Sequence, residues 1–272
     1  MILNVNDNVI PELADLWEKG FGDTREYIDL FLKQYAKSSL VFTDGEPGNI
    51  KCAAYLIPCK IIGLDKPAYY GYAATVLPSE RRNGIFKRIL SEMFEYMDKT
   101  KSALVQVPAE GLFDYYYKVG FTDFCKRKKF VFDEATSNCI ELEVLTVSGD
   151  EYCRLRNDCF NSKGCVQWSK EYVDYALDEI KFCKDICCKL VYSGETYVIH
   201  ASKKESVLTI HESTVPIEKL KLFTGVLMEY FNAEKIISYY PENPCGDGAV
   251  ENYALGYGVD YLPSAWLGLS ML

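Results

Sequence analysis

Hydrophobic residues recur at helical spacing in three stretches in the first half of the chain. Residues 10–35 contain two of these stretches, separated at Gly20-Phe21-Gly22-Asp23-Thr24, and therefore predict two helices. A third stretch follows Gly84 and predicts a strongly amphipathic helix. Its apolar face consists of Phe86, Ile89, Leu90, Met93, Phe94 and Met97.

Apolar runs bounded by turn residues predict the strands. Residues 38–62 predict two strands joined by a turn at 44–49, and residues 68–78 predict a third. The run SALVQVP predicts another strand, a short helix follows at 112–117, and Gly120-Phe121 opens a further strand. This strand–loop–helix–strand–helix–strand order predicts an α/β (α+β) fold.

The second half of the chain repeats this order faintly. Glu95-Tyr96-Met97-Asp98 and Glu229-Tyr230-Phe231-Asn232 stand 134 positions apart, and each closes a predicted helix. The repeat predicts two related domains, 1–135 and 136–272. At the same offset, positions 81 and 84 correspond to Val215 and Glu218, so chemistry carried by the first loop is expected only in the first domain.

Composition and charge exclude several classes of protein. The 272 residues are 49% hydrophobic and 25% charged, which argues against a disordered chain. A net charge of −9 argues against nucleic-acid binding. There is no basic segment leading into an apolar stretch and no apolar run of about 20 residues, so we expect a cytoplasmic protein without a membrane partner. The 11 cysteines are expected to be free thiols, and with only two histidines no metal site is expected.

The candidate chemistry lies in the loop Arg81-Arg82-Asn83-Gly84, between a predicted strand and the amphipathic helix. A helix N-terminus leaves main-chain N–H groups without partners and carries partial positive charge. Two arginines strengthen that charge, and Gly84 lets a ligand approach the main chain closely. The loop therefore predicts a pyrophosphate site. The alternative is a helix start with two solvated arginines.

The motifs resemble the GNAT (Gcn5-related N-acetyltransferase) superfamily, whose acetyl-CoA loop is written Q/R-x-x-G-x-G/A after a V-x-P strand end. Here Val76-Leu77-Pro78 precedes Arg81-x-x-Gly84-x-Phe86, with Phe86 departing from Gly or Ala. Tyr116 stands four residues before Gly120-Phe121, as in the family's Y-x-x-x-G-F signature. Residues 10–125 are similar to the two-domain Eis-like branch, through Leu16-Trp17, Phe21-Gly22-Asp23-Thr24 and Ala73–Pro78.

This resemblance implies a GNAT fold, with a mixed sheet splayed at the acetyl-CoA strand and a second, degenerate GNAT-like domain. It implies acetyl-CoA as cosubstrate and no metal. It assigns Tyr116 as general acid and the C-terminal carboxylate of Leu272 as a candidate base, with Glu110, Asp114 or water as alternatives. The residues it assigns to the cofactor are Val76, Arg81, Arg82, Asn83, Gly84, Ile85, Phe86 and Lys87.

The implied function is an acetyl-CoA-dependent N-acetyltransferase acting on a primary amine of a small molecule or peptide. An aromatic and acidic wall would suit a polyamine, an aminoglycoside-like amine or a lysine-like amine. Its candidate residues are Trp17, Phe21, Asp23, Glu26 and Tyr27. The alternative for Trp17 and Phe21 is the core, and for the acids a solvated face. A non-catalytic acyl-CoA-binding or sensor module, a structural role without CoA, and a homo-oligomer stay open.

Overall fold

The computed structural model describes residues 1–136 and 140–270, which form two compact units. The first unit comprises Met1–Phe124 with Ala254–Tyr261, and the second comprises Cys125–Tyr253 with Leu262–Ser270. The division into two related domains, 1–135 and 136–272, stays a prediction.

The first unit follows the predicted order of elements. They are β1 (Ile2–Leu3), α1 (Ile10–Phe21), α2 (Arg25–Gln34), β2 (Leu40–Asp44), β3 (Cys52–Ile61), β4 (Ala68–Val76), α3 (Ile85–Thr100), β5 (Ala103–Gln106) and α4 (Phe113–Lys118), with short 3₁₀ turns at Ala36–Ser38 and Pro78–Glu80. Two strands, β6 (Thr122–Phe132) and β13 (Ala249–Tyr257), contribute residues to both units.

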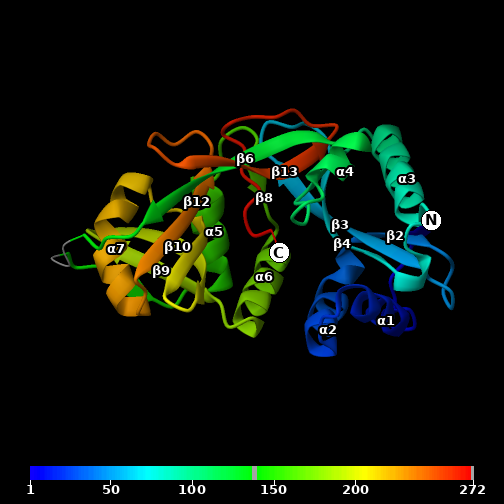
Figure 1. Cartoon of the computed structure of the whole chain (residues 1–272), viewed down its shortest axis with the longest axis horizontal. Helices are drawn as coiled ribbons and strands as arrows, with labels where there is room; N and C mark the ends of the chain where they lie inside the picture. The colour runs from blue at the N-terminus through cyan, green and yellow to red at the C-terminus, as the bar shows by residue number, and fades with distance from the viewer. Residues whose placement is uncertain (137–139, 271–272) are drawn as a thin grey trace. The chain divides into compact units, whose positions relative to one another are not determined.

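The sheet of the first unit has the order β1-β2-β3-β4-β5-β13. β4 and β5 run parallel, and the other neighbouring pairs are antiparallel. Figure 1 shows α1 and α2 on one face of this sheet and α3 on the other. The apolar face of α3 is buried in one core cluster with Leu56, Leu104 and Leu255 from the sheet, which explains its 3–4 residue spacing.

The second unit also has helices on both faces of a mixed sheet (Figure 1). Its elements are β7 (Glu143–Leu145), α5 (Gly149–Cys159), β8 (Val166–Gln167), α6 (Lys170–Phe182), β9 (Ile186–Tyr192), β10 (Glu195–Lys204), β11 (Val207–Ser213), α7 (Ile217–Phe231) and β12 (Lys235–Pro241). The order β6-β12-β11-β10-β9-β7 contains one parallel pair, β11 with β12, which flanks α7 in the chain.

The unit β11–α7–β12 therefore corresponds to β4–α3–β5, the other parallel pair with an intervening helix. The connections differ in length. Residues 77–84 separate β4 from α3, whereas only residues 214–216 separate β11 from α7. The second unit thus has no counterpart of the long basic loop, as the offset of the repeat predicted.

A buried ion pair fixes the segment 264–270 within the second unit. The Arg156 guanidinium lies 3.1 Å from a Glu212 carboxylate oxygen, and the two side chains are 0% and 1% exposed. Arg156 also donates to the main-chain carbonyl of Leu267, and Glu212 accepts a hydrogen bond from the Trp266 indole. Because each charge has several partners, the pair secures the segment to α5 and β11.

Candidate functional site

The site forms where β4 and β5 part. Their parallel pairing runs from Ala68–Ala103 to Gly71–Gln106, and β5 then ends while β4 continues to Val76. Beyond Gly71, β4 is therefore without its β5 partner. This is the splay that the sequence predicted at the acetyl-CoA strand.

A β-bulge lies in the part of β4 that extends beyond β5. On the β3 side, Tyr72 pairs with Tyr55 and Thr75 pairs with Ala53, so β4 has one residue more than β3 over this interval. Ala73 within the bulge has a φ of +46°, in the left-handed region. A bulge increases local twist and redirects main-chain groups, so it helps to carry β4 away from β5. No pattern in the sequence predicted this bulge.

The loop after Val76 leads directly into α3. Arg82 and Gly84 both have positive φ, +68° and +74°, and Gly84 is the N-cap of the helix. No side chain caps this helix, so the first-turn N–H groups are left for solvent or a ligand. A Cβ at Gly84 would meet nothing within 4 Å, which means that the approach to these N–H groups is open.

The predicted cofactor residues fall into two groups around this loop. Arg81, Arg82, Asn83, Gly84 and Lys87 are exposed, so the loop presents three cationic side chains. In contrast, Ile85 is buried in the core, and Val76 and Phe86 are half-buried. Ile85 can thus contribute only main-chain groups to a ligand. The cofactor roles of all eight residues stay predictions.

Arginine side chains brace the loop as well as charge it. Arg81 donates to the main-chain carbonyl of Gly20 over 2.7 Å and to that of Val76 over 3.4 Å. Arg88, which the sequence analysis did not single out, donates to the Asn83 carbonyl over 3.4 Å and pairs with Asp44 at 3.3 Å. The sequence position of Arg88 could have identified it, because a residue four positions after Gly84 lies one turn into the helix.

Tyr116, the predicted general acid, lies in α4 among other aromatic rings. The residue is 7% exposed, and its ring centroid lies 5.5 Å from that of Phe121 and 6.3 Å from that of Phe86. Burial raises the pKa of Tyr116 to about 12, Tyr115 adds to the rise, and the Gln106 carboxamide opposes it. The phenol therefore holds its proton at neutral pH, as a general acid must.

Phe86, the bulky residue at the last motif position, packs against two tyrosines of α4. The Phe86 ring stacks on Tyr115, with centroids 6.2 Å apart and an angle of 22° between the planes. It meets Tyr116 edge to face. Phe86 therefore connects the first turn of α3 to α4 and helps to fix the ring of Tyr116. Tyr117 lies apart, with its hydroxyl 2.5 Å from an Asp123 carboxylate oxygen.

The candidate bases are less well defined. Glu110 and Asp114 are both exposed, the first after β5 and the second in the first turn of α4. Leu272 lies outside the described residues. The preceding segment packs in the second unit, where Ala265, Trp266 and Leu267 are buried. The roles of these candidate bases stay predictions.

The predicted acceptor wall is split between core and surface. Trp17 is 3% exposed, packs against Phe31, Tyr55 and Tyr72, and donates its indole N–H to Asp23 over 2.7 Å. Trp17 therefore lies in the core, which was the alternative that the sequence analysis left open. Phe21, by contrast, is 53% exposed, and its ring meets Trp17 edge to face.

The remaining wall residues lie on α2. Glu26 is exposed, and the Tyr27 hydroxyl lies 3.4 Å from that of Tyr72 on β4. The structure thus brings Phe21, Asp23 and Tyr27 around Trp17 on the α1–α2 face. Acceptor binding by all five residues stays a prediction.

The sequence analysis missed Gln106, the last residue of β5. Its side chain is buried, and its Nε2 has no hydrogen-bond partner of ordinary geometry within the described part of the chain. A signal was available, because Gln106 is the one polar residue inside the apolar run Ala103–Pro108. A polar group buried in a strand requires an explanation.

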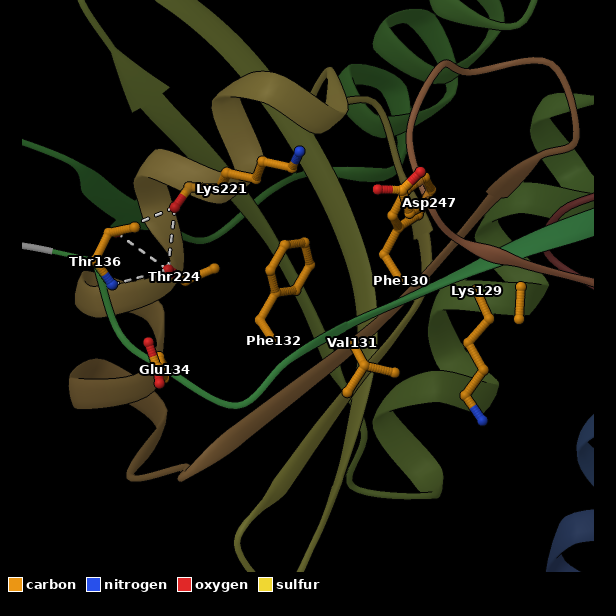
Figure 2. A pocket seen from close by; sticks show the side chains of 10 residues that line it. Lys129, Phe130, Val131, Phe132, Glu134, Thr136, Lys221, Thr224 and Asp247 are labelled. Carbon is orange, nitrogen blue, oxygen red and sulfur yellow. Dashed lines mark hydrogen bonds between the residues drawn. The ribbon is translucent and has the colours of Figure 1, made fainter.

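Other features of the second unit lie apart from these motifs. A pocket of about 570 Å³ is lined by β6, α7 and residues 134–136 and 247–249, and no predicted site residue lines it. Figure 2 shows the Phe132 ring within it and Lys221 and Asp247 at its rim. His200 and His211 lie side by side, with ring centroids 5.1 Å apart.

Across residues 1–136 and 140–270, no cluster of three or more His, Cys, Asp or Glu side chains is arranged to hold a metal ion. In the same part of the chain, no helix has the length and apolar character needed to cross a membrane.

Comparisons with known proteins agree with this geometry. Residues 2–123 match the model of the family described as acetyltransferase (GNAT) domain. A GCN5-related N-acetyltransferase from Anabaena variabilis ATCC 29413 has a TM-score of 0.69 at 11% identity, over 96% of this chain and 73% of that one. Eis1 from Mycobacterium abscessus has a TM-score of 0.61 at 9% identity, over 94% and 73%.

A tandem GNAT protein from the clavulanic acid biosynthesis pathway has a TM-score of 0.56 at 13% identity, over 94% of this chain and 97% of that one. At these identities the likeness concerns the fold. It confirms the mixed sheet followed by a second GNAT-like unit, and together with the family match it confirms the resemblance inferred from the motifs. No curated protein matches the chain significantly.

Proposed function

From the GNAT acetyltransferase domain that residues 2–123 form, we infer that the protein is an acetyl-CoA-dependent N-acetyltransferase acting on a primary amine. One observation carries this proposal. β4 leaves β5 after the Gly71–Gln106 pair, and the same strand leads into an uncapped helix N-terminus with three exposed cationic side chains. An open strand beside an anion site suits a ligand with an amide-containing arm and a diphosphate.

The residues of the loop fit the diphosphate of coenzyme A. Main-chain N–H groups from Arg82 to Lys87 would donate to the phosphate oxygens, while Arg81 keeps the loop attached to α1. The edge of β4 beyond Gly71 that β5 does not cover would bind the pantetheine arm as an added strand. Acetyl-CoA would supply the acetyl thioester.

The chain's own residues would supply a hydrogen-bond donor to the thioester, an acid and a base. A main-chain N–H at the Val76 end of β4 would donate to the thioester carbonyl oxygen and stabilise negative charge there. The Tyr116 phenol, protonated at neutral pH, would give its proton to the departing thiolate. Glu110 or Asp114 would accept the proton of the amine, directly or through water, because both carboxylates are exposed near the end of β5.

The proposed acceptor is a cationic amine of a small molecule or peptide. Phe21 and Glu26 are the exposed members of the predicted wall, and Asp23 and Tyr27 are partly exposed beside them. An aromatic surface with carboxylates attracts a protonated amine through charge and cation–π contacts. A polyamine, an aminoglycoside-like amine and a lysine-like amine all have this chemistry.

The test is thiol release from acetyl-CoA by the full chain in the presence of amines of these three kinds. We expect release that depends on one amine, with an acetylated product detected by mass spectrometry. A Tyr116→Phe variant should lower kcat by about 10²-fold, since a general acid contributes this much. Tyr117→Phe is the matched control, because the Tyr117 hydroxyl bonds Asp123 on the surface.

A specific observation keeps the sensor alternative in view. The strand before the loop reads Tyr72-Ala73-Ala74-Thr75 and offers no carboxylate as base. Calorimetric binding of acetyl-CoA without release of CoA by any amine would favour a non-catalytic acyl-CoA-binding module. If acetyl-CoA does not bind, or if Gly84→Asp leaves its binding unchanged, both functions are contradicted.

A further inference from the structure

Gln106 occupies the point at which the two strands of the site separate. It is the last residue of β5 and pairs with Gly71, the last residue of β4 that has a β5 partner. Gly71 carries no side chain, and a Cβ there would lie 3.3 Å from the Gln106 Oε1 atom. The sheet therefore leaves room for the Gln106 carboxamide directly at the splay.

The Gln106 carboxamide is buried at this point of the sheet. Gln106 is 7% exposed, and its Nε2 lacks a hydrogen-bond partner of ordinary geometry among residues 1–136 and 140–270. A buried donor without a partner destabilises a protein by about 1–3 kcal/mol. A chain that keeps such a group beside its ligand groove uses it for something other than stability.

The Tyr116 hydroxyl is the polar group whose pKa the carboxamide affects. Gln106 opposes the rise of the Tyr116 pKa, which is the effect of a donor on the phenol oxygen. The ring of Tyr116 is held by Phe86, Tyr115 and Phe121, which leaves little freedom except at the hydroxyl.

We propose that Gln106 is a positioning residue for Tyr116, with its Nε2 donating a hydrogen bond to the phenol oxygen in the loaded site. This rests on the proposed acetyltransferase function. When the phenol oxygen accepts a hydrogen bond from Gln106, the phenol O–H cannot point at Gln106. It is then free to point at the sulfur of the thioester. As the amine forms its C–N bond, the C–S bond breaks and the sulfur takes the phenol proton. The phenolate, stabilised by Gln106, regains a proton from solvent, which receives the one lost by the amine.

The test compares the full chain with Gln106→Met, which has the same shape but no donor. We expect kcat to fall about tenfold and the KM for acetyl-CoA to stay within about twofold. The melting temperature should not fall, because the substitution removes an unpaired buried amide. In a Tyr116→Phe background, the same substitution should change kcat by less than about twofold, because the two residues act as a unit. Gln34→Met, at an exposed position of α2, is the matched control.

A second variant keeps the test decisive if Gln106→Met does not fold. Gln106→Glu introduces a carboxyl that donates only when protonated. The ratio of its kcat to the wild-type kcat at the same pH should therefore rise toward one as pH falls through the pKa of that carboxyl. A kcat that is unaffected, or a loss of the same factor with and without Tyr116, would overturn the inference.

The two proposals fail in different ways. If the wild-type chain neither binds acetyl-CoA nor releases CoA with any amine, the proposed function is wrong and the role of Gln106 is wrong with it. If the wild-type chain turns over and Gln106→Met keeps its kcat within about twofold, only the role of Gln106 is wrong.

Discussion

Arg81 and Gly20 are joined by a hydrogen bond of 2.7 Å, from the guanidinium to the main-chain carbonyl. Gly20 lies near the end of α1, on the face of the sheet opposite to α3 (Figure 1). The bond therefore attaches the candidate phosphate loop, which leads into α3, to α1. The attachment requires a glycine, because a Cβ at position 20 would lie 2.1 Å from the Thr75 Cγ2 atom. Loop, helix and β4 therefore meet at one point.

The first prediction concerns this attachment. Arg81→Ala removes both the bond to Gly20 and one positive charge, so we expect the Kd for acetyl-CoA to rise about tenfold by calorimetry. Stability should change by less than about 1 kcal/mol, because the side chain is exposed. Arg154→Ala is the matched control, since it removes an exposed charge from α5 in the second unit. Equal effects of the two variants on binding would contradict the prediction.

The second prediction concerns Gly84, whose φ of +74° favours glycine. Gly84→Ala should destabilise the chain by about 1 kcal/mol through backbone strain alone, because nothing lies within 4 Å of the added Cβ. Gly84→Asp should in addition weaken acetyl-CoA binding by charge repulsion. Gly84→Asn, which tolerates positive φ better, is the control. Chemical denaturation and calorimetry measure the two effects separately.

The third prediction is the alkaline pH profile. Because the pKa of Tyr116 is raised to about 12, its proton is retained far above neutral pH. We expect no loss of kcat from ionisation of Tyr116 up to about pH 10, the ordinary pKa of tyrosine. An alkaline fall in kcat centred below that pH, present in the wild type and absent from Tyr116→Phe, would show that the phenol is not held as the structure describes.

The fourth prediction concerns the buried pair Arg156–Glu212. Glu212→Gln leaves the Arg156 charge buried without its counter-charge, so we expect a loss of about 3 kcal/mol in the free energy of unfolding. Replacing both residues, as in Arg156→Met with Glu212→Leu, should cost less than Glu212→Gln alone, because no uncompensated charge remains. Urea denaturation measures both. A double variant less stable than the single one would contradict this account.

The fifth prediction concerns acid stability. Burial lowers the pKa of His200 and of His211 to about 4, and the two rings lie 5.1 Å apart. A histidine whose pKa is lowered on folding stabilises the fold above its unfolded pKa of about 6.5, and this contribution is lost as pH falls toward 4.

We therefore expect the free energy of unfolding to fall between pH 6.5 and pH 4 by about 1–3 kcal/mol more in the wild type than in His200→Phe. The variant removes one titrating ring and keeps an aromatic one. Ser202, whose hydroxyl lies 2.7 Å from the His211 Nε2, stays available to the remaining histidine. Equal acid sensitivity of the two proteins would contradict the assignment.

Local patterns predicted the elements around the site well. The periodicity of residues 85–98 and the strand on each side of them predicted β4, α3 and β5, because one face of α3 packs on that sheet. The turn residues of the loop, and the spacing from Tyr116 to Gly120, likewise depend on short-range geometry. Such features depend on residues that are close in the sequence, so they can be predicted without tertiary information.

Features that depend on distant pairing could not be predicted. Leu255 pairs with Gln106 across most of the chain, and nothing in either segment specifies the other. The bulge at Ala73 is set by the register against β3. Trp17 was assigned to an acceptor wall through the resemblance, with the core as its alternative, and Tyr55 and Tyr72 pack against it in the structure.

The position of β13 has a consequence for biosynthesis. Residues 254–257 supply the strand that covers β5 in the first unit, although about 130 residues of the other unit, Cys125–Tyr253, are translated in between. A nascent chain therefore exposes the open edge of β5 on the ribosome until those residues emerge. The first unit therefore cannot complete its sheet ahead of the rest, and a nonsense mutation anywhere upstream of Ala254 would leave that sheet incomplete.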